Sequence, residues 1–222
     1  MTYSTVLFDL DGTLLNTLYD LRASMNRALA AFGFPPRTME EVRSFVGNGM
    51  KDYTARAVPP GTDEDTKAAV LSAFKKDYAE HCADDTVPYD GILPMLEALK
   101  ANGIKTAIVS NKGDFAVKLL AKHYFNDLVD AALGETATIP KKPAPDMVRA
   151  ALSELNASIE HALYVGDSDV DFDTAMNAGL DVALVDWGFR DRSLLSARLA
   201  SLPDSRKGTI VSTVDDLLSV IL

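Results

Sequence analysis

Short apolar runs alternate with helical patterns along most of the chain. The runs are rich in β-branched and aliphatic residues, and they occupy residues 6–8, 106–109, 128–133, 162–165, 182–185 and 209–211. Between them, apolar residues recur at the spacing of an amphipathic helix, as in residues 147–155. Strands that alternate with helices are typical of a parallel sheet with helices on both faces. The pattern predicts an α/β fold with a Rossmann-like, mostly parallel sheet.

The stretch between the first two runs breaks this alternation. Residues 16–87 carry helical stripes with no clear strand between them. Such a stretch is far longer than an ordinary connection from a strand to a helix. We therefore expect a helical cap domain at 16–87, inserted into an α/β core domain formed by 1–15 and 88–222. Hinges are expected near 15–19 and 83–91.

Composition narrows the class of protein. The chain has 222 residues, of which 47% are hydrophobic, and a net charge of −10, which argues against binding nucleic acid or an anionic membrane. Cys82 is the only cysteine, so no internal disulfide can form, as is usual in a reducing cytosol. No apolar run approaches the length of a membrane span, and the start shows no secretory signal. These features predict a cytoplasmic globular protein.

Two aspartates follow the first apolar run. Asp9 and Asp11 stand two residues apart at a predicted strand end, so both carboxylates are expected to point the same way, and Gly12 comes next. Ligands of open α/β sheets bind beyond the carboxyl ends of the strands. Carboxylates this close repel each other unless a cation or a shared proton lies between them. The alternative is a simple Asp-Gly turn.

A second acidic segment follows the run at 162–165. Asp167 and Asp171 lie four residues apart across a predicted strand-to-helix turn, so both can approach one site. Carboxylate oxygens are ligands that suit Mg²⁺. Helix capping by Ser168 or Asp169 is the alternative explanation for part of this segment.

Two further segments offer groups that bind anions. Ser110 and Asn111 follow the second run, where a hydroxyl and backbone N–H groups can bind phosphate oxygens. Lys142 lies in a proline-flanked loop at 140–146, which can aim its ammonium group. Taken alone, these segments are also consistent with an ordinary loop and with solvated surface lysines. Together with the aspartates they place a cation site beside an anion site, which is the combination that phosphoryl transfer needs.

In these four segments, in their order and spacing, the chain resembles the haloacid dehalogenase (HAD) superfamily, and most closely its phosphoglycolate phosphatases. The resemblance implies that Asp9 is a nucleophile forming an aspartyl-phosphate and that Asp11 is the general acid and base. It implies that Mg²⁺ is held by Asp9, by the backbone carbonyl of Asp11 and by Asp167, with Asp171 holding the metal's waters. The presence of Asp11 favours phosphate chemistry over carbon–halogen cleavage, because the dehalogenases of this superfamily lack this second aspartate.

The resemblance also implies which residues bind the substrate. Ser110, Lys142 and the backbone N–H of Asn111 would bind the phosphoryl oxygens, and Ser110 and Lys142 count as catalytic with the two aspartates. In capped members the insertion supplies further contacts. We expect one or two of the residues that flank the loop at 47–49, namely Arg43, Asn48, Lys51 and Arg56, to contact the non-phosphate end of the substrate. The alternative is that these residues are solvated on the surface of the cap helices.

The expected function is that of a Mg²⁺-dependent phosphatase acting on a small phosphorylated metabolite, with 2-phosphoglycolate as the leading candidate. The alternatives are a β-phosphoglucomutase-like mutase, a sugar or nucleotide phosphatase and a pyrophosphatase. A non-enzymatic Mg²⁺- and phosphate-binding module, like a receiver domain, is opposed by the length of the chain and by Asp11. Nucleic acid and membranes are not expected as partners, and the oligomeric state is open between monomer and homodimer.

Overall fold

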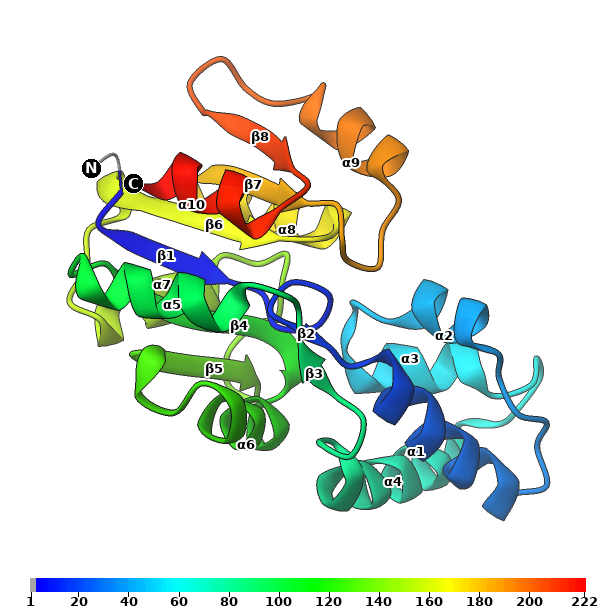
Figure 1. Cartoon of the computed structure of the whole chain (residues 1–222). Coiled ribbons are helices and arrows are strands. Elements are labelled where there is room, and N and C mark those ends of the chain that lie inside the picture. The colour runs from blue at the N-terminus through cyan, green and yellow to red at the C-terminus, as the bar shows by residue number, and fades with distance from the viewer. Residues whose placement is uncertain (1–2) are drawn as a thin grey trace.

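Six parallel strands form one sheet at the centre of the molecule (Figure 1). The computed structural model describes residues 3–222. In chain order the strands are β1 (Thr5–Phe8), β4 (Lys105–Gly113), β5 (Ala131–Glu135), β6 (Ala162–Gly166), β7 (Asp181–Val185) and β8 (Gly208–Val211). Across the sheet the order is β5-β4-β1-β6-β7-β8, so β1 lies between β4 and β6. The predicted α/β fold with a mostly parallel sheet is confirmed.

Helices cover both faces of this sheet. One face packs against α5 (Ile92–Ala101), α6 (Asp114–Tyr124) and α10 (Val214–Ile221), and the other against α7 (Asp146–Glu154), α8 (Asp169–Ala178) and α9 (Arg192–Leu199). The side chains of β1 alternate between these layers, with Val6 and Phe8 on the first face and Leu7 on the second. Because both faces are buried, the strands appear in the sequence as continuous apolar runs.

Two strands differ from their predicted extents. The run predicted at 128–133 becomes a strand only at Ala131, because Asn126–Leu128 forms a 3₁₀ turn that begins at a residue with a φ of 46°. Strand β4 continues to Gly113, but its pairing with β5 is interrupted between Val109 and Gly113. Residues 110–112 therefore do not pair with β5, although they lie at the end of the sheet.

Residues 16–87 form four helices that pack on one another: α1 (Leu18–Ala31), α2 (Met39–Phe45), α3 (Gly49–Ala57) and α4 (Glu64–His81), here called the cap helices. Their shared interior includes Met25, Leu29, Phe74 and Tyr78, all fully buried. In Figure 1 they lie on the side toward which β1 points.

The chain enters and leaves the cap helices through two short strands. β2 (Leu15–Asn16) pairs antiparallel with β3 (Val87–Pro88). The buried carboxylate of Asp20 accepts hydrogen bonds from the backbone N–H groups of Asp85 and Thr86, at 2.8 to 3.1 Å. The two crossings are thus tied to each other at the predicted hinges.

The predicted division into core and cap domains agrees with where these helices begin and end but stays a prediction. Residues 1–2 of the predicted core segment 1–15 lie outside the described part of the chain. Over residues 3–222, no helix is both long enough and apolar enough to pass through a bilayer.

Candidate active site

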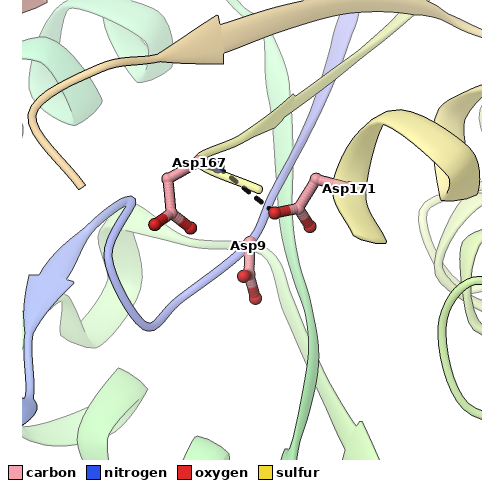
Figure 2. Close-up of side chains that lie close together, drawn as sticks. All are labelled: Asp9, Asp167 and Asp171. Atoms are coloured by element: carbon pink, nitrogen blue, oxygen red, sulfur yellow. Dashed lines mark hydrogen bonds between the residues drawn. The ribbon is translucent and has the colours of Figure 1, made fainter. Parts of the chain in front are cut away.

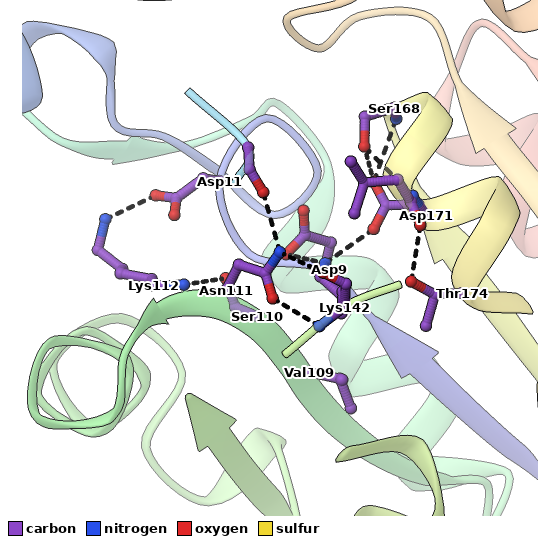
Figure 3. A network of polar contacts seen from close by, with 12 residues as sticks. Asp9, Asp11, Val109, Ser110, Asn111, Lys112, Lys142, Ser168, Asp171 and Thr174 are labelled. Atoms are coloured by element: carbon purple, nitrogen blue, oxygen red, sulfur yellow. Dashed lines mark hydrogen bonds and ion pairs between the residues drawn. The ribbon is translucent and has the colours of Figure 1, made fainter. Parts of the chain in front are cut away.

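Three neighbouring strands bring the predicted site residues to one edge of the sheet. Asp9 follows β1, Ser110 lies near the end of β4 and Asp167 follows β6. Because β4, β1 and β6 are adjacent and parallel, their carboxyl ends meet at the same edge. Lys142 comes from the connection between β5 and α7, and all four side chains are buried. Figure 3 shows how the groups from β1, β4 and the Lys142 loop face one another.

Three carboxylates gather at this edge. Asp9, Asp167 and Asp171 each offer one oxygen, and these oxygens lie within 4.8 Å of one another (Figure 2). Burial raises the pKa of Asp9 to about 7, although nearby Lys142 opposes the shift, and repulsion from Asp171 and Asp11 adds to it. Burial and repulsion from Asp171 and Asp9 also raise the pKa of Asp167 well above its ordinary value. A divalent cation would relieve this repulsion, so the donor set fits Mg²⁺.

Asp171 differs from the other two carboxylates in how fully its oxygens are occupied. Oδ2 accepts hydrogen bonds from the hydroxyl and N–H of Ser168 and from the N–H of Asp167, and it closes the capping box at the start of α8. Oδ1 accepts hydrogen bonds from Lys142 Nζ at 2.8 Å and from Tyr164 at 3.3 Å. These bonds favour a role in holding neighbouring groups over direct coordination of a cation.

Glycines frame the Asp167 carboxylate. A Cβ at Gly12 or at Gly188 would overlap Asp167 atoms, and Gly12 also has a φ of +86°, which L-residues rarely adopt. The N–H of Phe189 donates a hydrogen bond to Asp167 Oδ2 at 2.6 Å. The side chain is therefore fixed from two sides by backbone that only glycine allows so close.

Lys142 lies between two of the carboxylates. Its Nζ is 2.9 Å from Asp9 Oδ1 and 2.8 Å from Asp171 Oδ1, and the side chain is 2% exposed. Burial alone would lower the pKa of Lys142, but the negative charges of Asp171 and Asp9 outweigh it and raise the pKa well above its usual range. A permanent positive charge therefore faces Asp9, where an anionic group could bind.

Asn111 connects three parts of the site. Its Nδ2 donates hydrogen bonds to the carbonyls of Gly47, at 3.1 Å, and Lys142, at 3.0 Å, and its Oδ1 accepts one from the Lys142 N–H at 2.8 Å. The Asn111 side chain thus holds together the Lys142 loop and the loop before α3. The neighbouring Ser110 hydroxyl is buried and accepts a weak hydrogen bond from the Lys112 N–H at 3.3 Å.

Asp11 has a partner that the sequence interpretation did not single out. Lys112 Nζ donates a hydrogen bond to Asp11 Oδ1 at 2.7 Å, and Thr17 Oγ1 donates to the same oxygen at 2.6 Å. Lys112 belongs to the segment that carries Ser110 and Asn111, but Asp11 lies 101 positions away along the chain, so no local pattern could reveal the contact.

A cavity lies between this edge and the cap helices. Its lining from the sheet edge is Asp9, Asp11, Ser110, Asn111, Lys112, Asp167, Ser168, Phe189 and Arg190, and its lining from 16–87 is Leu21, Val46, Gly47, Gly49, Met50 and Tyr53. The lining from 16–87 has no charged side chain.

Arg43, Asn48 and Lys51 do not line the cavity. The Arg43 guanidinium donates hydrogen bonds to the carbonyls of Phe189, at 2.6 Å, and Gly188, at 3.3 Å. The Asn48 carbonyl accepts a hydrogen bond from Lys141 Nζ at 2.7 Å, and Lys51 is exposed. The structure thus brings the strand-edge residues together and leaves these three outside, and their predicted role in substrate binding stays a prediction.

Residues 6–185 match the sequence profile of one family, described as haloacid dehalogenase-like hydrolase. The chain belongs to this family. It is 31% identical to a phosphoglycolate phosphatase of Aquifex aeolicus, over 95% of this chain and 96% of that protein. The predicted resemblance to HAD phosphoglycolate phosphatases is confirmed, as is the expectation of a hydrolase of the phosphatase type.

Solved structures agree with this assignment. A protein of Lactobacillus delbrueckii subsp. bulgaricus, provisionally named a phosphoglycolate phosphatase, is 33% identical with a TM-score of 0.91, over 100% of this chain and 99% of that one. CbbY of Rhodobacter sphaeroides, solved in complex with phosphate, is 25% identical with a TM-score of 0.73, over 94% and 93% of the two chains. The HAD fold therefore extends through the cap helices as well as the sheet.

Proposed function

We propose that this chain hydrolyses small phosphomonoesters in a Mg²⁺-dependent reaction that passes through an aspartyl-phosphate on Asp9. The observation that carries the proposal is the buried edge where the Asp9 carboxylate lies 2.9 Å from Lys142 and beside Asp167. A carboxylate is a weak nucleophile toward an anionic phosphate, so positive charge on both sides of it is what the reaction requires. Asp9 and Asp167 would hold Mg²⁺, which supplies such charge when bound.

The reaction would proceed in two displacements. In the first, a carboxylate oxygen of Asp9 attacks phosphorus, the bond from phosphorus to the leaving alkoxide breaks, and Asp11 gives its proton to that oxygen. In the second, a water oxygen attacks phosphorus, its proton passes to Asp11, and the bond to Asp9 breaks. Lys142 and the Ser110 hydroxyl would hold the phosphoryl oxygens throughout. Asp11 lines the same cavity as Asp9, as both steps require.

The lining of the cavity favours a phosphoryl group that carries a small organic part. Charged and polar groups of the sheet edge form part of its wall, and Leu21, Val46, Met50 and Tyr53 add an apolar part. Phosphoglycolate phosphatases are among the similar proteins, so 2-phosphoglycolate is the leading candidate substrate. We further propose that residues 16–87 act as a cap domain that closes over the site, since Met50 and Tyr53 form part of the cavity wall.

The test is phosphate release from a panel of 2-phosphoglycolate, sugar phosphates, nucleotides and pyrophosphate, with and without Mg²⁺. Wild type would be compared with Asp9→Asn and with Asp173→Asn, which changes a carboxylate of α8 that pairs instead with Arg198. We expect Mg²⁺-dependent release that Asp9→Asn reduces at least about 1,000-fold and Asp173→Asn leaves within about 2-fold. No release by wild type from any compound contradicts the proposal, and transfer between hydroxyls without net release indicates a mutase.

A further inference from the structure

Lys112 is a buried cation at this edge of the sheet to which the proposed reaction assigns no role. Its side chain is 2% exposed, and Nζ lies 2.7 Å from Asp11 Oδ1. A buried ammonium group is costly unless it is paired, and over residues 3–222 the only carboxylate within ion-pair distance of it is Asp11. Lys112 and Asp11 are therefore held to each other strongly.

The donors to Asp11 all lie on one of its two oxygens. Lys112 Nζ and Thr17 Oγ1 both donate to Oδ1, and no described residue donates to Oδ2. Such an arrangement fixes the rotation of the carboxyl group and leaves Oδ2 as the oxygen free to exchange a proton with a ligand. Asp11 lines the cavity, so this free oxygen belongs to a group in reach of substrate.

Lys112 also contacts the cap helices. Its Nζ lies 4.6 Å from the centre of the Tyr78 ring, and Tyr78 belongs to α4 and is fully buried. An ammonium group over an aromatic face is stabilised by the ring electrons, more so away from water. Thr17, the second donor, directly precedes α1. Both supports of Asp11 thus depend on where the cap helices lie.

We propose that Lys112 is a positioning residue that holds the Asp11 carboxyl in its reacting orientation, and that Tyr78 and Thr17 make this orientation depend on the seated cap helices. The proposal rests on the proposed function, because it assigns Lys112 to the residue that would transfer the protons. Asp11 would be set for proton transfer only with the cap helices in place over the substrate.

The first test is a double-mutant cycle between Lys112→Met and Asp11→Ala. Lys112→Met keeps the length of the side chain and removes its charge. With an alkyl phosphomonoester found by the panel above, we expect kcat to fall about 100-fold and KM to change less than about 3-fold. In the Asp11→Ala background, the same change should cost less than about 2-fold, because its target is already gone.

Lys141→Met is the matched control. Lys141 also joins the sheet edge to the cap helices, through the Asn48 carbonyl and Asp52, but has no contact with Asp11. Its effect should therefore be equal in the two backgrounds. If Lys112→Met costs as much in the Asp11→Ala enzyme as in wild type, or if it chiefly raises KM, Lys112 binds substrate directly and the proposal is overturned.

An aryl phosphate separates positioning from a general loss of structure. Its leaving group departs without a proton, so the initial burst of p-nitrophenol from Lys112→Met should stay within about 3-fold of wild type while steady turnover slows about 100-fold. Equal slowing of the burst and of turnover would overturn the proposal.

The link to the cap helices is tested by Tyr78→Phe, which keeps the aromatic ring, and by Tyr78→Leu, which removes it. Thr17→Val, an isosteric change that removes the hydroxyl, serves as a second test should the leucine variant not fold. We expect Tyr78→Phe within about 2-fold of wild type and kcat losses of about 10-fold for the other two. Unchanged kcat in Thr17→Val contradicts the link. Absence of Mg²⁺-dependent release from wild type would instead remove the proposed function, and Lys112's role with it.

Discussion

Arg190 and Arg43 each bind the backbone of the segment that carries the other, where the loop after β7 meets α2. Arg190, in the loop after β7, donates hydrogen bonds to the carbonyls of Arg43, at 2.9 Å, and Val46, at 2.5 Å. Arg43, at the end of α2, donates to the carbonyl of Phe189 at 2.6 Å. Since the N–H of Phe189 binds Asp167, this crossed pair connects the cap helices to the carboxylate cluster.

Removing either guanidinium should weaken closure of the cap helices over any substrate. We expect Arg43→Met and Arg190→Met to raise KM about 10-fold for 2-phosphoglycolate and for an aryl phosphate alike. Steady-state kinetics on both substrates would measure this. Arg198→Met, which breaks an ion pair with Asp173 on α8, is the control and should leave KM unchanged. A KM increase confined to 2-phosphoglycolate in Arg43→Met would indicate that Arg43 contacts the substrate.

The stabilisation of the protein by Mg²⁺ should grow with pH. The pKa of Asp9 is raised from 3.8 to about 7, so proton binding favours the folded, metal-free protein below pH 3.8, and this contribution is lost as pH rises toward 7. A cation that replaces the proton reverses the loss. We expect Mg²⁺ to raise Tm by about 5 °C at pH 8 and by about 1 °C or less at pH 5.5.

Thermal unfolding with and without Mg²⁺ at both pH values measures this difference. In Asp9→Asn, which cannot ionise, the Mg²⁺ effect should be small at both pH values. A gain from Mg²⁺ in wild type that is equal at pH 5.5 and pH 8 would show that cation binding is not coupled to the protonation of Asp9.

Neutralising Asp167 and neutralising Asp171 should have opposite effects on metal-free stability. Asp171 pairs with buried Lys142 and caps α8, so Asp171→Asn should lower the free energy of unfolding by about 3 kcal/mol. Burial raises the pKa of Asp167, so its charge is unfavourable, and Asp167→Asn should raise stability at pH 8 in the absence of Mg²⁺. Chemical denaturation in EDTA measures both variants. Equal losses would mean that Asp167 supports the fold as Asp171 does.

Gly12→Ala should harm both the fold and the cation site. The new Cβ would overlap Asp167 Oδ2 at a backbone position with a φ of +86°. The matched control is Gly103→Ala, where φ is +71° and nothing lies within 4 Å of the new Cβ. We expect about 1 kcal/mol lost in the control and about 3 kcal/mol in Gly12→Ala. Only Gly12→Ala should weaken Mg²⁺ binding, as followed by calorimetry, and equal losses in the two variants would exclude the overlap.

The sheet edge was predictable because its chemistry follows directly after strands. Asp9 and Asp167 each come immediately after an apolar run, and a run buried on both faces can be recognised without tertiary knowledge. Neighbouring parallel strands then bring such residues together whatever the intervening sequence. Lys142 was predicted from its proline-flanked loop and from the family resemblance, but its ion pairs with Asp9 and Asp171 could not be predicted, because that loop lies far from both carboxylates along the chain.

The contacts that the cap helices make with the core could not be predicted from the sequence, and the reason is physical. Whether Arg43 faces the cavity or the 188–189 backbone depends on how α2 is turned against the loop after β7, and these segments lie 146 positions apart. The sequence around Arg43, a charged residue near a glycine-containing loop, is compatible with both orientations. Lys112 was missed for a similar reason, since Asp11 is its partner only when the first and second core strands lie side by side.

The two-residue ladder between β2 and β3, with Asp20 binding the N–H groups of Asp85 and Thr86, has a consequence for how such a chain can be altered. The backbone pairs between residues 15–16 and 87–88 hold the ends of the segment from 17 to 86 together, and Asp20 adds a second tie just inside them. An insertion with adjoining ends adds little closure entropy and leaves the register of the sheet untouched. Another helical segment grafted between the same ends would keep the sheet in register but would need its own counterparts of Thr17 and Tyr78 to orient Asp11, so selectivity and proton transfer would be exchanged together.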